Sequence, residues 1–410
     1  MKKAIARFFL FLLTVSILLT LCSGCASRRI TDSPDVQSEL QMMVKHKYAD
    51  FALAYNLPPH LGMFLYIETE QDSYSAKAGF SDKPYTENTH YRIASVSKTF
   101  TAASIMLLDQ MGKLRIKDSV VDAIPGRSIS YLPDTWEFAI PHKEEITIKD
   151  LLSHRAGVFD VFNEIIPETS SQPYAGQNYI GYIQDTVGDA MHPYTLAELS
   201  GVIAIDQLTY GKPGTLYHYS DSGYMLLPVI IERVAQMPFE EFLLQNFFLP
   251  MNLTGTYAVH EPEDTTLAQP FFEGYTRWDA EFFITTEDNM TSNIGAGHII
   301  STPKDMARWI RPLLLAQGPL SELTIETMKT VVEGNSNYSL GLSHSALGVG
   351  HSGAHPGYMN IVVYNEEHDT AIVMVAPFID YNEGNMEHII ATLTVMQEIM
   401  SEALTIMEKM

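Results

Sequence analysis

Strand-forming segments lie near both ends of this 410-residue chain, and mostly helical segments lie between them. Residues 60–68 and 74–80 are short apolar and aromatic runs separated by a polar stretch, a pattern typical of a β-hairpin. Residues 358–365 and 370–377 repeat that pattern near the C-terminus. Because both hairpins can join one sheet, the sequence predicts an α+β fold, in which an antiparallel β-sheet is built from both termini and flanked by helices.

The helical segments indicate what covers this sheet and what is inserted into it. Apolar residues at helical spacing predict helices over residues 38–55, 97–111, 222–236, 239–248 and 386–407. The region from about 125 to 285 is rich in helix and loop signals. We therefore expect one domain over residues 38–410, with a mostly helical inserted subdomain at about 125–285. A cleft should lie where the insert meets the sheet.

The N-terminus has the pattern of an export signal. Lys2, Lys3 and Arg7 precede the apolar stretch 8–21, which is too short to span a membrane comfortably. Small residues then precede Cys25, an order similar to a bacterial lipobox. We expect a signal peptide over residues 1–24, a lipid on Cys25 and a linker over 25–37. Ordinary cleavage and an uncleaved anchor are the alternatives. The protein would then be exported and held at the cell envelope.

Composition narrows the partners and the chemistry. The 26 Lys and Arg residues against 49 Asp and Glu residues give a formal net charge of −23, which argues against a nucleic-acid partner because binding phosphates needs a basic surface. Both cysteines, Cys22 and Cys25, lie in the predicted leader. The mature fold is therefore expected to have no internal disulfide and no cysteine-based metal site.

A serine and a lysine at helical spacing form the first candidate for chemistry. Ser95 and Lys98 enter the apolar helix predicted at 97–111, and positions i and i+3 face the same way. A serine hydroxyl needs a nearby base to become a nucleophile. A lysine that faces a protein core either forms an ion pair or takes part in catalysis. The same spacing recurs at Ser301 and Lys304, where we expect Ser301 or Thr302 to cap a helix instead.

Two further short segments are candidates for the same site. In Tyr219-Ser220-Asp221, the Tyr219 phenol could relay protons, whereas the alternative is a helix start with Ser220 or Asp221 as its cap. His351-Ser352-Gly353 precedes the strand at 358–365, and a glycine-flanked turn there can direct backbone N–H groups at a substrate oxygen.

A rival interpretation concerns residues 350–354, which nearly match the nucleophile elbow of α/β-hydrolases. An elbow requires a strand, a sharp turn and then a helix. A strand follows here instead, so this alternative is disfavoured.

The order S-x-x-K, then Y-S-D, then H-x-G resembles the serine β-lactamase and penicillin-binding protein superfamily. The chain is most similar to the group that contains class C β-lactamases and D-alanyl-D-alanine carboxypeptidases. Residues 146–157, 213–215 and 301–306 also resemble common segments of that group. The resemblance extends from about residue 61 to 377 and implies the sheet-and-insert fold already expected.

The resemblance also implies residue roles. Ser95 would be the nucleophile, Lys98 would take or shuttle its proton, and Tyr219 would act as general base and then general acid. Backbone N–H groups of Ser95 and Ala354 would form the oxyanion hole, beside Gly353. No metal or organic cofactor is implied.

Two substrate-binding positions depart from the usual residues of this group. His351 stands where many relatives have Lys, so its charge would vary around a free pKa of about 6.5. Asp221 stands where Asn is usual, and an ionised Asp cannot donate a hydrogen bond to a substrate oxygen. Asp221 would instead pair with Lys98, or cap a helix and point out of the cleft.

These residues predict a serine hydrolase that forms an acyl-enzyme on Ser95. The first expectation is a D-alanyl-D-alanine carboxypeptidase-like activity on peptidoglycan peptides. An esterase, a D-amino-acid amidase and a β-lactamase are alternatives within the family, and an inactive penicillin-binding or sensor module is the alternative outside enzymes. The substrate would be a small peptide, ester or amide, and the oligomeric state stays open.

Overall fold

The computed structural model describes residues 35–382 and 386–409, so the predicted leader and Cys25 lie outside the described residues. The helices are α1 (Val36–Ala54), α2 (Ser97–Gln110), α3 (Ile148–Leu152), α4 (Tyr179–Gly181), α5 (Leu196–Ile205), α6 (Asp221–Ala235), α7 (Phe239–Leu243), α8 (Pro303–Leu314), α9 (Glu322–Lys329) and α10 (Glu387–Met407). The strands are β1 (Gly62–Glu68), β2 (Ser73–Gly79), β3 (Tyr91–Arg92), β4 (Tyr257–Ala258), β5 (Tyr275–Arg277), β6 (Phe282–Ile284), β7 (Ile299–Ser301), β8 (Ser343–Ser345), β9 (Gly348–His355), β10 (Tyr358–Asn365), β11 (Thr370–Ala376) and β12 (Phe378–Asp380).

The largest sheet joins the two ends of the chain, as predicted. Its six strands lie in the order β2-β1-β11-β10-β9-β8, and each neighbouring pair is antiparallel. Phe64 of β1 lies opposite Val375 of β11, which brings the two predicted hairpins side by side. The α+β fold with a sheet built from both termini is therefore confirmed.

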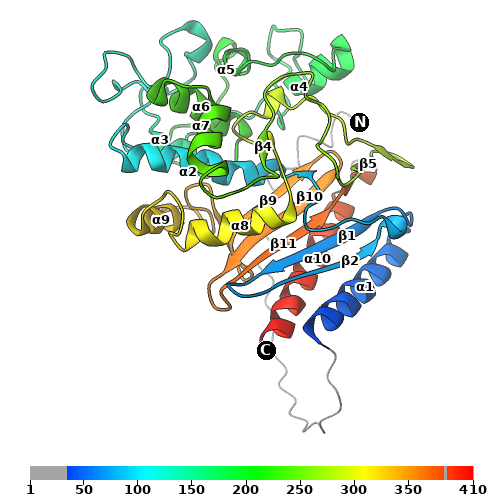
Figure 1. The fold of residues 1–410 in the computed structure, drawn as a ribbon. Coiled ribbons are helices and arrows are strands. Elements are labelled where there is room, and N and C mark those ends of the chain that lie inside the picture. Colours follow the sequence, from blue (N-terminus) through cyan, green and yellow to red (C-terminus); the bar gives the residue numbers. More distant parts are fainter. Residues whose placement is uncertain (1–34, 383–385, 410) are drawn as a thin grey trace.

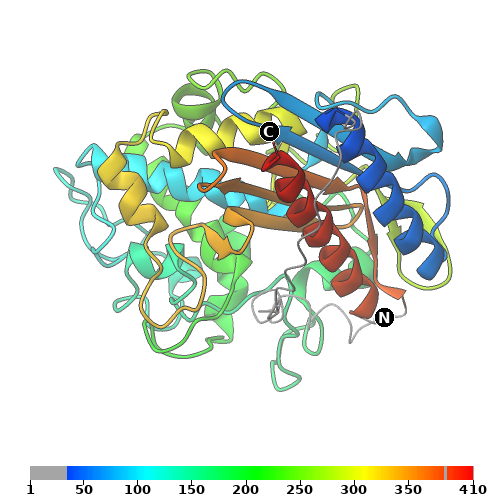
Figure 2. The same cartoon turned by 90° about the horizontal axis from the view of Figure 1, so that it is seen from below.

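Helices cover both faces of this sheet. Figures 1 and 2 show α1 and α10 lying across one face, while α8 and the helical region lie against the other. Side chains alternate between the faces along β1: Met63 and Leu65 pack toward α1 and α10, whereas Phe64 and Tyr66 join the core on the α8 side. Two apolar cores therefore sandwich the sheet.

The inserted region contains more irregular backbone than the sequence predicted. Helix α3 has only five residues, and α4 and α7 continue directly into π-helical turns at 182–187 and 244–248, so the helix predicted at 239–248 is present. The short strands β4, β5 and β6 of this region join strands from outside the region in two small sheets, β12-β5-β6 and β3-β7-β4. Strand β6, which pairs with β5, was not among the elements predicted from the sequence. The longest helix of the region, α6, begins at Asp221 and agrees with the prediction over 222–236.

Side-chain caps fix where two helices begin. Thr147 caps α3 through a capping box with Asp150, because each side chain accepts from the other residue's backbone N–H. Thr302 caps α8 by accepting from the Asp305 N–H at 3.2 Å. Ser301 ends β7, and its Oγ lies 2.8 Å from Thr256 Oγ1. The second serine–lysine spacing is therefore a helix start capped by Thr302, with Ser301 outside the cap.

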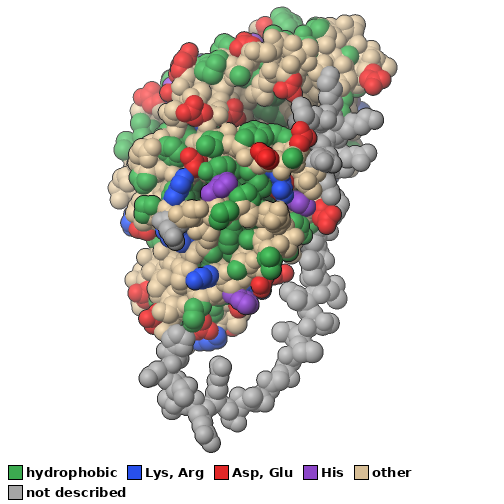
Figure 3. Space-filling view, turned by 90° about the vertical axis from the view of Figure 1, so that its right-hand side faces the viewer, with side chains coloured by type: hydrophobic (Ala, Val, Ile, Leu, Met, Phe, Trp, Pro, Cys, Tyr) green, Lys and Arg blue, Asp and Glu red, His purple; other side chains and the backbone are tan. Residues whose placement is uncertain are grey.

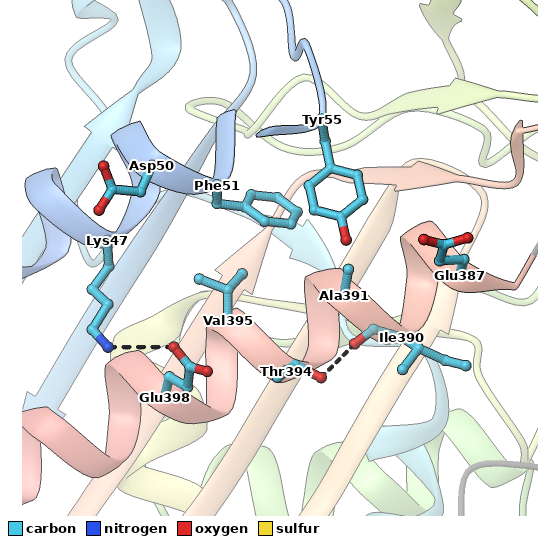
Figure 4. Close-up of a pocket in the computed structure, with 10 residues that line it drawn as sticks. All are labelled: Lys47, Asp50, Phe51, Tyr55, Glu387, Ile390, Ala391, Thr394, Val395 and Glu398. Atoms are coloured by element: carbon cyan, nitrogen blue, oxygen red, sulfur yellow. Dashed lines mark hydrogen bonds and ion pairs between the residues drawn. The ribbon is translucent and has the colours of Figure 1, made fainter. Parts of the chain in front are cut away.

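The groove between α1 and α10 lies on the face of the sheet opposite α2 (Figure 4). It has a volume of about 550 Å³, and a Lys47–Glu398 ion pair of 3.3 Å bridges its two helices. Among the described residues, α10 is the one helix long and apolar enough to cross a membrane. Half of it is buried in the protein, where Met396, Ile399 and Met400 pack on the sheet. Its apolar character is therefore explained by the core.

Charged side chains are dispersed on the face shown in Figure 3. Acidic side chains are spread across this face, and Lys and Arg side chains stand singly between acidic, apolar and neutral ones. This face therefore offers no concentrated positive surface.

Candidate active site

Ser95 lies in a tight turn at the entrance to α2. Residues Ala94–Val96 form one turn of 3-10 helix that runs directly into α2, and Ser95 is only 7% exposed. Ala94 has φ +49°, a conformation that costs a non-glycine residue on the order of 1 kcal/mol. Strand β9 passes close by: a Cβ on Gly353 would lie 2.3 Å from the Ile93 carbonyl oxygen. Gly353 therefore allows β9 to approach the turn that carries Ser95.

Lys98 faces Ser95 from the first turn of α2, as the spacing predicted. Its Nζ lies 2.9 Å from Ser95 Oγ, 2.8 Å from the Ala296 carbonyl oxygen and 2.6 Å from Asp221 Oδ1. Three oxygens thus surround the three N–H bonds of an ammonium, and Lys98 is fully buried. Burial lowers the pKa of Lys98, and the Asp221 carboxylate opposes that shift.

Tyr219 completes the group around Ser95. The phenol hydrogen-bonds to Ser95, and its ring centroid lies 5.0 Å from Lys98 Nζ. Burial and the Asp221 carboxylate raise the pKa of Tyr219 well above its usual value. Since Lys98 donates to Ser95 Oγ, the Ser95 hydroxyl is left to donate to Tyr219. Tyr219 is therefore placed to receive the serine proton, although the environment disfavours its phenolate.

Asp221 points into the site rather than out of it. Ser220 is the cap of α6, because its Oγ accepts from the Gly223 N–H at 3.1 Å. Asp221 is only 6% exposed, and its Oδ1 makes the 2.6 Å ion pair with Lys98. The interpretation of Asp221 as an outward-pointing cap is therefore wrong, and the predicted pairing with Lys98 is present.

His351 lies in the site, but its charge differs from the expectation. Its Nδ1 lies 2.6 Å from the Ser352 carbonyl oxygen and donates to it, so Nε2 accepts from the Tyr338 hydroxyl at 3.1 Å. Burial and the neighbouring Lys98 ammonium lower the pKa of His351 to about 3. The imidazole is therefore neutral at physiological pH. The prediction that its charge varies around pH 6.5 is therefore wrong.

Residues 351–354 lie within strand β9 and not in the turn that we expected. His351 pairs with Val362 and Ala354 with Met359 across β9 and β10. Glycines at 348, 350 and 353 hid this strand in the sequence, because glycine is depleted in strands. Strand β10 follows directly, so residues 350–354 do not form a nucleophile elbow. Side-chain alternation places His351 and Gly353 on the Ser95 side and Ala354 toward the opposite core.

Four residues that the sequence did not single out surround this group. His154 stacks on Tyr219 with ring centroids 4.1 Å apart, and its Nδ1 accepts from the Ser220 N–H at 3.1 Å. The Tyr338 hydroxyl forms a hydrogen bond with His351 Nε2. Asp160 and Asn163 contact Asp221. Of these four residues, Asp160 could have been found from the sequence, because an acidic residue with two apolar residues on each side is expected to be buried and paired.

The site brings together Ser95, Lys98, Tyr219, Asp221 and His351 from three separate parts of the chain. Among the described residues, no group of three or more His, Cys, Asp or Glu side chains is arranged to hold a metal ion. The side chains that meet at Ser95 are a lysine and a tyrosine in contact with it, and a carboxylate paired with the lysine.

Comparison with known proteins assigns the family. The family model described as Beta-lactamase matches residues 60–377, which include every residue placed around Ser95 above. The chain belongs to the Beta-lactamase family. Members of this family are serine hydrolases, so the activated serine agrees with the family chemistry.

Relatives within the Beta-lactamase family are distant in sequence. Penicillin-binding protein 4* of Bacillus subtilis (strain 168) is 24% identical over 312 residues, which cover 72% of this chain and 62% of the relative. Protein flp of Staphylococcus aureus (strain MRSA252) is 23% identical over 296 residues, covering 70% and 52%. The matches thus span only about half to three-fifths of these relatives.

Solved structures of similar fold cover nearly the whole chain. The D-amino acid amidase from Ochrobactrum anthropi SV3 aligns with a TM-score of 0.68 at 20% identity, covering 90% of this chain and 99% of its own. The octameric penicillin-binding protein homologue from Pyrococcus abyssi gives 0.62 at 22% identity, covering 89% and 77%. At these identities the likeness shows the β-lactamase/transpeptidase fold.

Proposed function

We propose that this member of the Beta-lactamase family hydrolyses small ester, amide or peptide substrates through an acyl-enzyme on Ser95. The observation that carries the proposal is the 2.9 Å contact between Lys98 Nζ and Ser95 Oγ, in a site where Tyr219 also bonds to Ser95. An unactivated serine is a poor nucleophile, and this arrangement supplies both a proton acceptor and a cation.

The proposed reaction has two steps that use the same residues. Tyr219 first loses its phenol proton to solvent, and Ser95 Oγ then attacks the substrate carbonyl carbon while the serine proton passes to the Tyr219 phenolate. Backbone N–H groups of Ser95 and Ala354 would stabilise the oxyanion. Tyr219 then gives the proton to the leaving group. Water attacks the acyl-enzyme with Tyr219 again as base, which releases the acid and restores Ser95. The Lys98 ammonium, whose Nζ lies 5.0 Å from the Tyr219 ring centroid, would stabilise the phenolate before it accepts the serine proton.

The charges near Ser95 favour substrates without a carboxylate on the leaving group. His351 is neutral, and the Lys98 ammonium is already paired with Asp221 at 2.6 Å. A peptide that ends in D-alanine would bring a carboxylate toward a site without a free cation among the residues named here. We therefore propose that neutral esters are turned over faster than such peptides.

The D-alanyl-D-alanine carboxypeptidase activity remains a second candidate. The relatives with penicillin-binding protein names favour it, and the charges argued above disfavour it. A catalytically inactive binding module is disfavoured because Ser95, Lys98 and Tyr219 are held in contact.

Turnover on a matched panel separates these candidates. The panel contains a D-Ala-D-Ala peptide, short-chain esters, a D-amino acid amide and a chromogenic cephalosporin, each compared by kcat/KM. We expect the esters to give the highest values. A peptide-specific enzyme with no ester activity would contradict the proposed preference, and no turnover or labelling with any substrate would contradict hydrolysis.

Asp221 gives the proposal a quantitative test. Its carboxylate cannot donate to a substrate oxygen, and its charge raises the pKa of Tyr219, which must accept the serine proton. Amides need more help than esters because their leaving groups are poorer. Asp221→Asn restores a donor and removes the charge, so we expect amide and β-lactam acylation to rise about 10-fold, or about 1.4 kcal/mol of transition-state stabilisation.

The measurement for Asp221 is the ratio of ester to amide kcat/KM on substrates with the same acyl group. We expect this ratio to fall in Asp221→Asn. Ser220→Thr is the matched control, because threonine is also a preferred helix cap and leaves the charges of Lys98 and Asp221 in place. An unchanged ratio in folded Asp221→Asn would remove Asp221 from substrate discrimination.

Export and lipid attachment are proposed from the leader alone. We expect the mature protein to begin at lipid-modified Cys25, and Cys25→Ala to release the protein from membranes into the soluble fraction. Intact mass of the native protein checks this directly. An unmodified N-terminus at another residue would contradict the lipid.

A further inference from the structure

One polar side chain links the two elements that carry the proposed oxyanion hole. Asn360 lies in strand β10, directly opposite Gly353 of β9. Its Nδ2 donates to the Ile93 carbonyl oxygen at 3.1 Å and to the Gly353 carbonyl oxygen at 3.4 Å. Ile93 precedes the turn that carries Ser95, so one amide group joins that turn to β9.

The orientation and burial of the Asn360 amide are those of a group with a specific task. Two carbonyl oxygens face it, and they require a donor, which fixes Nδ2 toward them. The side chain is 0% exposed, and its Oδ1 has no hydrogen-bond partner among the described residues. A buried polar atom without a partner costs stability, and an apolar residue would avoid that cost. Stability alone therefore does not explain an asparagine in this strand.

The bond to Gly353 determines where the Ala354 N–H points. The Gly353 carbonyl and the Ala354 N–H belong to one trans peptide, so they point in opposite directions. Because the carbonyl is directed at Asn360 on the β10 side, the N–H is directed at the outer edge of β9. Among the described residues, β8 pairs with β9 only at residues 348–350, so no strand covers that edge at Ala354.

The bond to Ile93 supports the turn on the other side of the hole. The Ile93 carbonyl also accepts from the Val96 N–H at 3.2 Å, and this bond closes the turn around Ser95. A Cβ on Gly353 would lie 2.6 Å from Asn360 Nδ2, so glycine leaves the amide room to reach both carbonyls. Donation to the Gly353 carbonyl also polarises its peptide, which strengthens the Ala354 N–H as a donor.

We propose that Asn360 is a positioning residue that sets the N–H groups of Ser95 and Ala354 relative to each other and so forms the oxyanion hole. This inference rests on the proposed acyl-enzyme chemistry. Asn360 acts through the Ile93 and Gly353 carbonyls and not on the substrate itself. Oxyanion donors must lie about 2.7–3.1 Å from the developing charge, so a small displacement of either N–H group slows acylation.

The test compares an oxygen ester with its thiono ester, in which sulfur replaces the carbonyl oxygen. Sulfur is a weak hydrogen-bond acceptor, so the thiono ester gains little from an oxyanion hole. Removing one oxyanion donor costs about 10²–10³-fold in rate, and Asn360→Leu displaces a donor without removing it. We therefore expect kcat/KM for p-nitrophenyl acetate to fall about 10-fold, while that for p-nitrophenyl thionoacetate stays within about 2-fold of wild type.

Asn365→Leu is the matched control. Asn365 is also buried in β10, and its Nδ2 donates to a backbone carbonyl, that of Leu347, at 3.1 Å. Its variant loses the same kind of bond away from Ser95 and should keep the wild-type ratio of oxygen to thiono ester. An unchanged ratio in folded Asn360→Leu, or an equal loss on both esters, would overturn the inference.

A structure of labelled wild-type protein covers the case in which Asn360→Leu does not fold. Crystals of the full chain labelled with a fluorophosphonate should show the phosphoryl oxygen within about 3.1 Å of the backbone nitrogens of Ser95 and Ala354. The Asn360 amide should still contact both carbonyls. A phosphoryl oxygen on other donors, or an Asn360 amide turned away, would overturn the inference. Failure of the fluorophosphonate to label Ser95 would instead overturn the proposed acyl-enzyme, so the two failures are distinguishable.

Discussion

Ser95→Ala is expected to abolish ester turnover while the fold stays intact. Loss of a nucleophile from a coupled catalytic group costs on the order of 10⁶ in rate, because Lys98 and Tyr219 then have no group to activate. The side chain removed is small, and its bonds are to Lys98 and Tyr219. Steady-state kinetics and a circular dichroism melt on the same sample measure both halves of the expectation.

Ser301→Ala is the matched control for Ser95→Ala. Ser301 has the same spacing to a lysine, but it lies at the end of β7, its Oγ bonds to Thr256, and α8 is capped by Thr302. Its turnover should equal that of the wild type. If activity survives in Ser95→Ala and disappears in Ser301→Ala, the nucleophile is Ser301, and the assignment of Ser95 is contradicted.

Lys98→Met is expected to damage both stability and activity. The variant leaves the Asp221 carboxylate buried without the cation that lies 2.6 Å away. Removing one partner of a buried ion pair leaves the other charge uncompensated and lowers the free energy of unfolding by about 3–5 kcal/mol. Activity should fall on the order of 10⁴ or more, since the group around Ser95 acts as a unit.

The double variant Lys98→Met with Asp221→Asn separates the two effects. It removes both charges, so most of the lost stability should return while turnover stays absent. Lys143→Met is the matched control: Lys143 is also buried, but its Nζ donates to the Pro133 carbonyl at 2.7 Å, so its loss strands no carboxylate. Urea unfolding of the four proteins measures this. Wild-type stability in Lys98→Met, or turnover in the double variant, would contradict the ion pair's proposed role.

The sequence predicted the parts of the fold that local patterns determine. The hairpins β1–β2 and β10–β11 were visible because apolar runs are split by polar turns, and helices α1, α2, α6 and α10 because apolar residues recur at helical spacing. Strand β9 was missed because three glycines replace the side chains that mark a strand. Glycine is needed at these positions because neighbouring backbone leaves no room for a side chain, as where Gly353 lies against the Ile93 carbonyl.

The sequence predicted the central residues of the site and the Lys98–Asp221 pair, but not the neutral state of His351 or the residues behind Asp221. Ser95 and Lys98 face each other through local helix geometry, which spacing alone determines. The neutrality of His351 depends on burial and on Lys98, and neither is visible in a local motif. Asp160 and Asn163 reach Asp221 through the path of an irregular loop, across about 60 residues of sequence, which no periodicity encodes.

Covalent trapping of Ser95 tests the proposed catalysis most directly. The wild-type protein is incubated with a fluorophosphonate, its intact mass is measured, and the modified peptide is sequenced by tandem mass spectrometry. We expect one adduct per chain, located on Ser95, with none in Ser95→Ala and normal labelling in Ser301→Ala. An adduct on another residue, or no adduct on folded wild-type protein, would contradict an acyl-enzyme on Ser95.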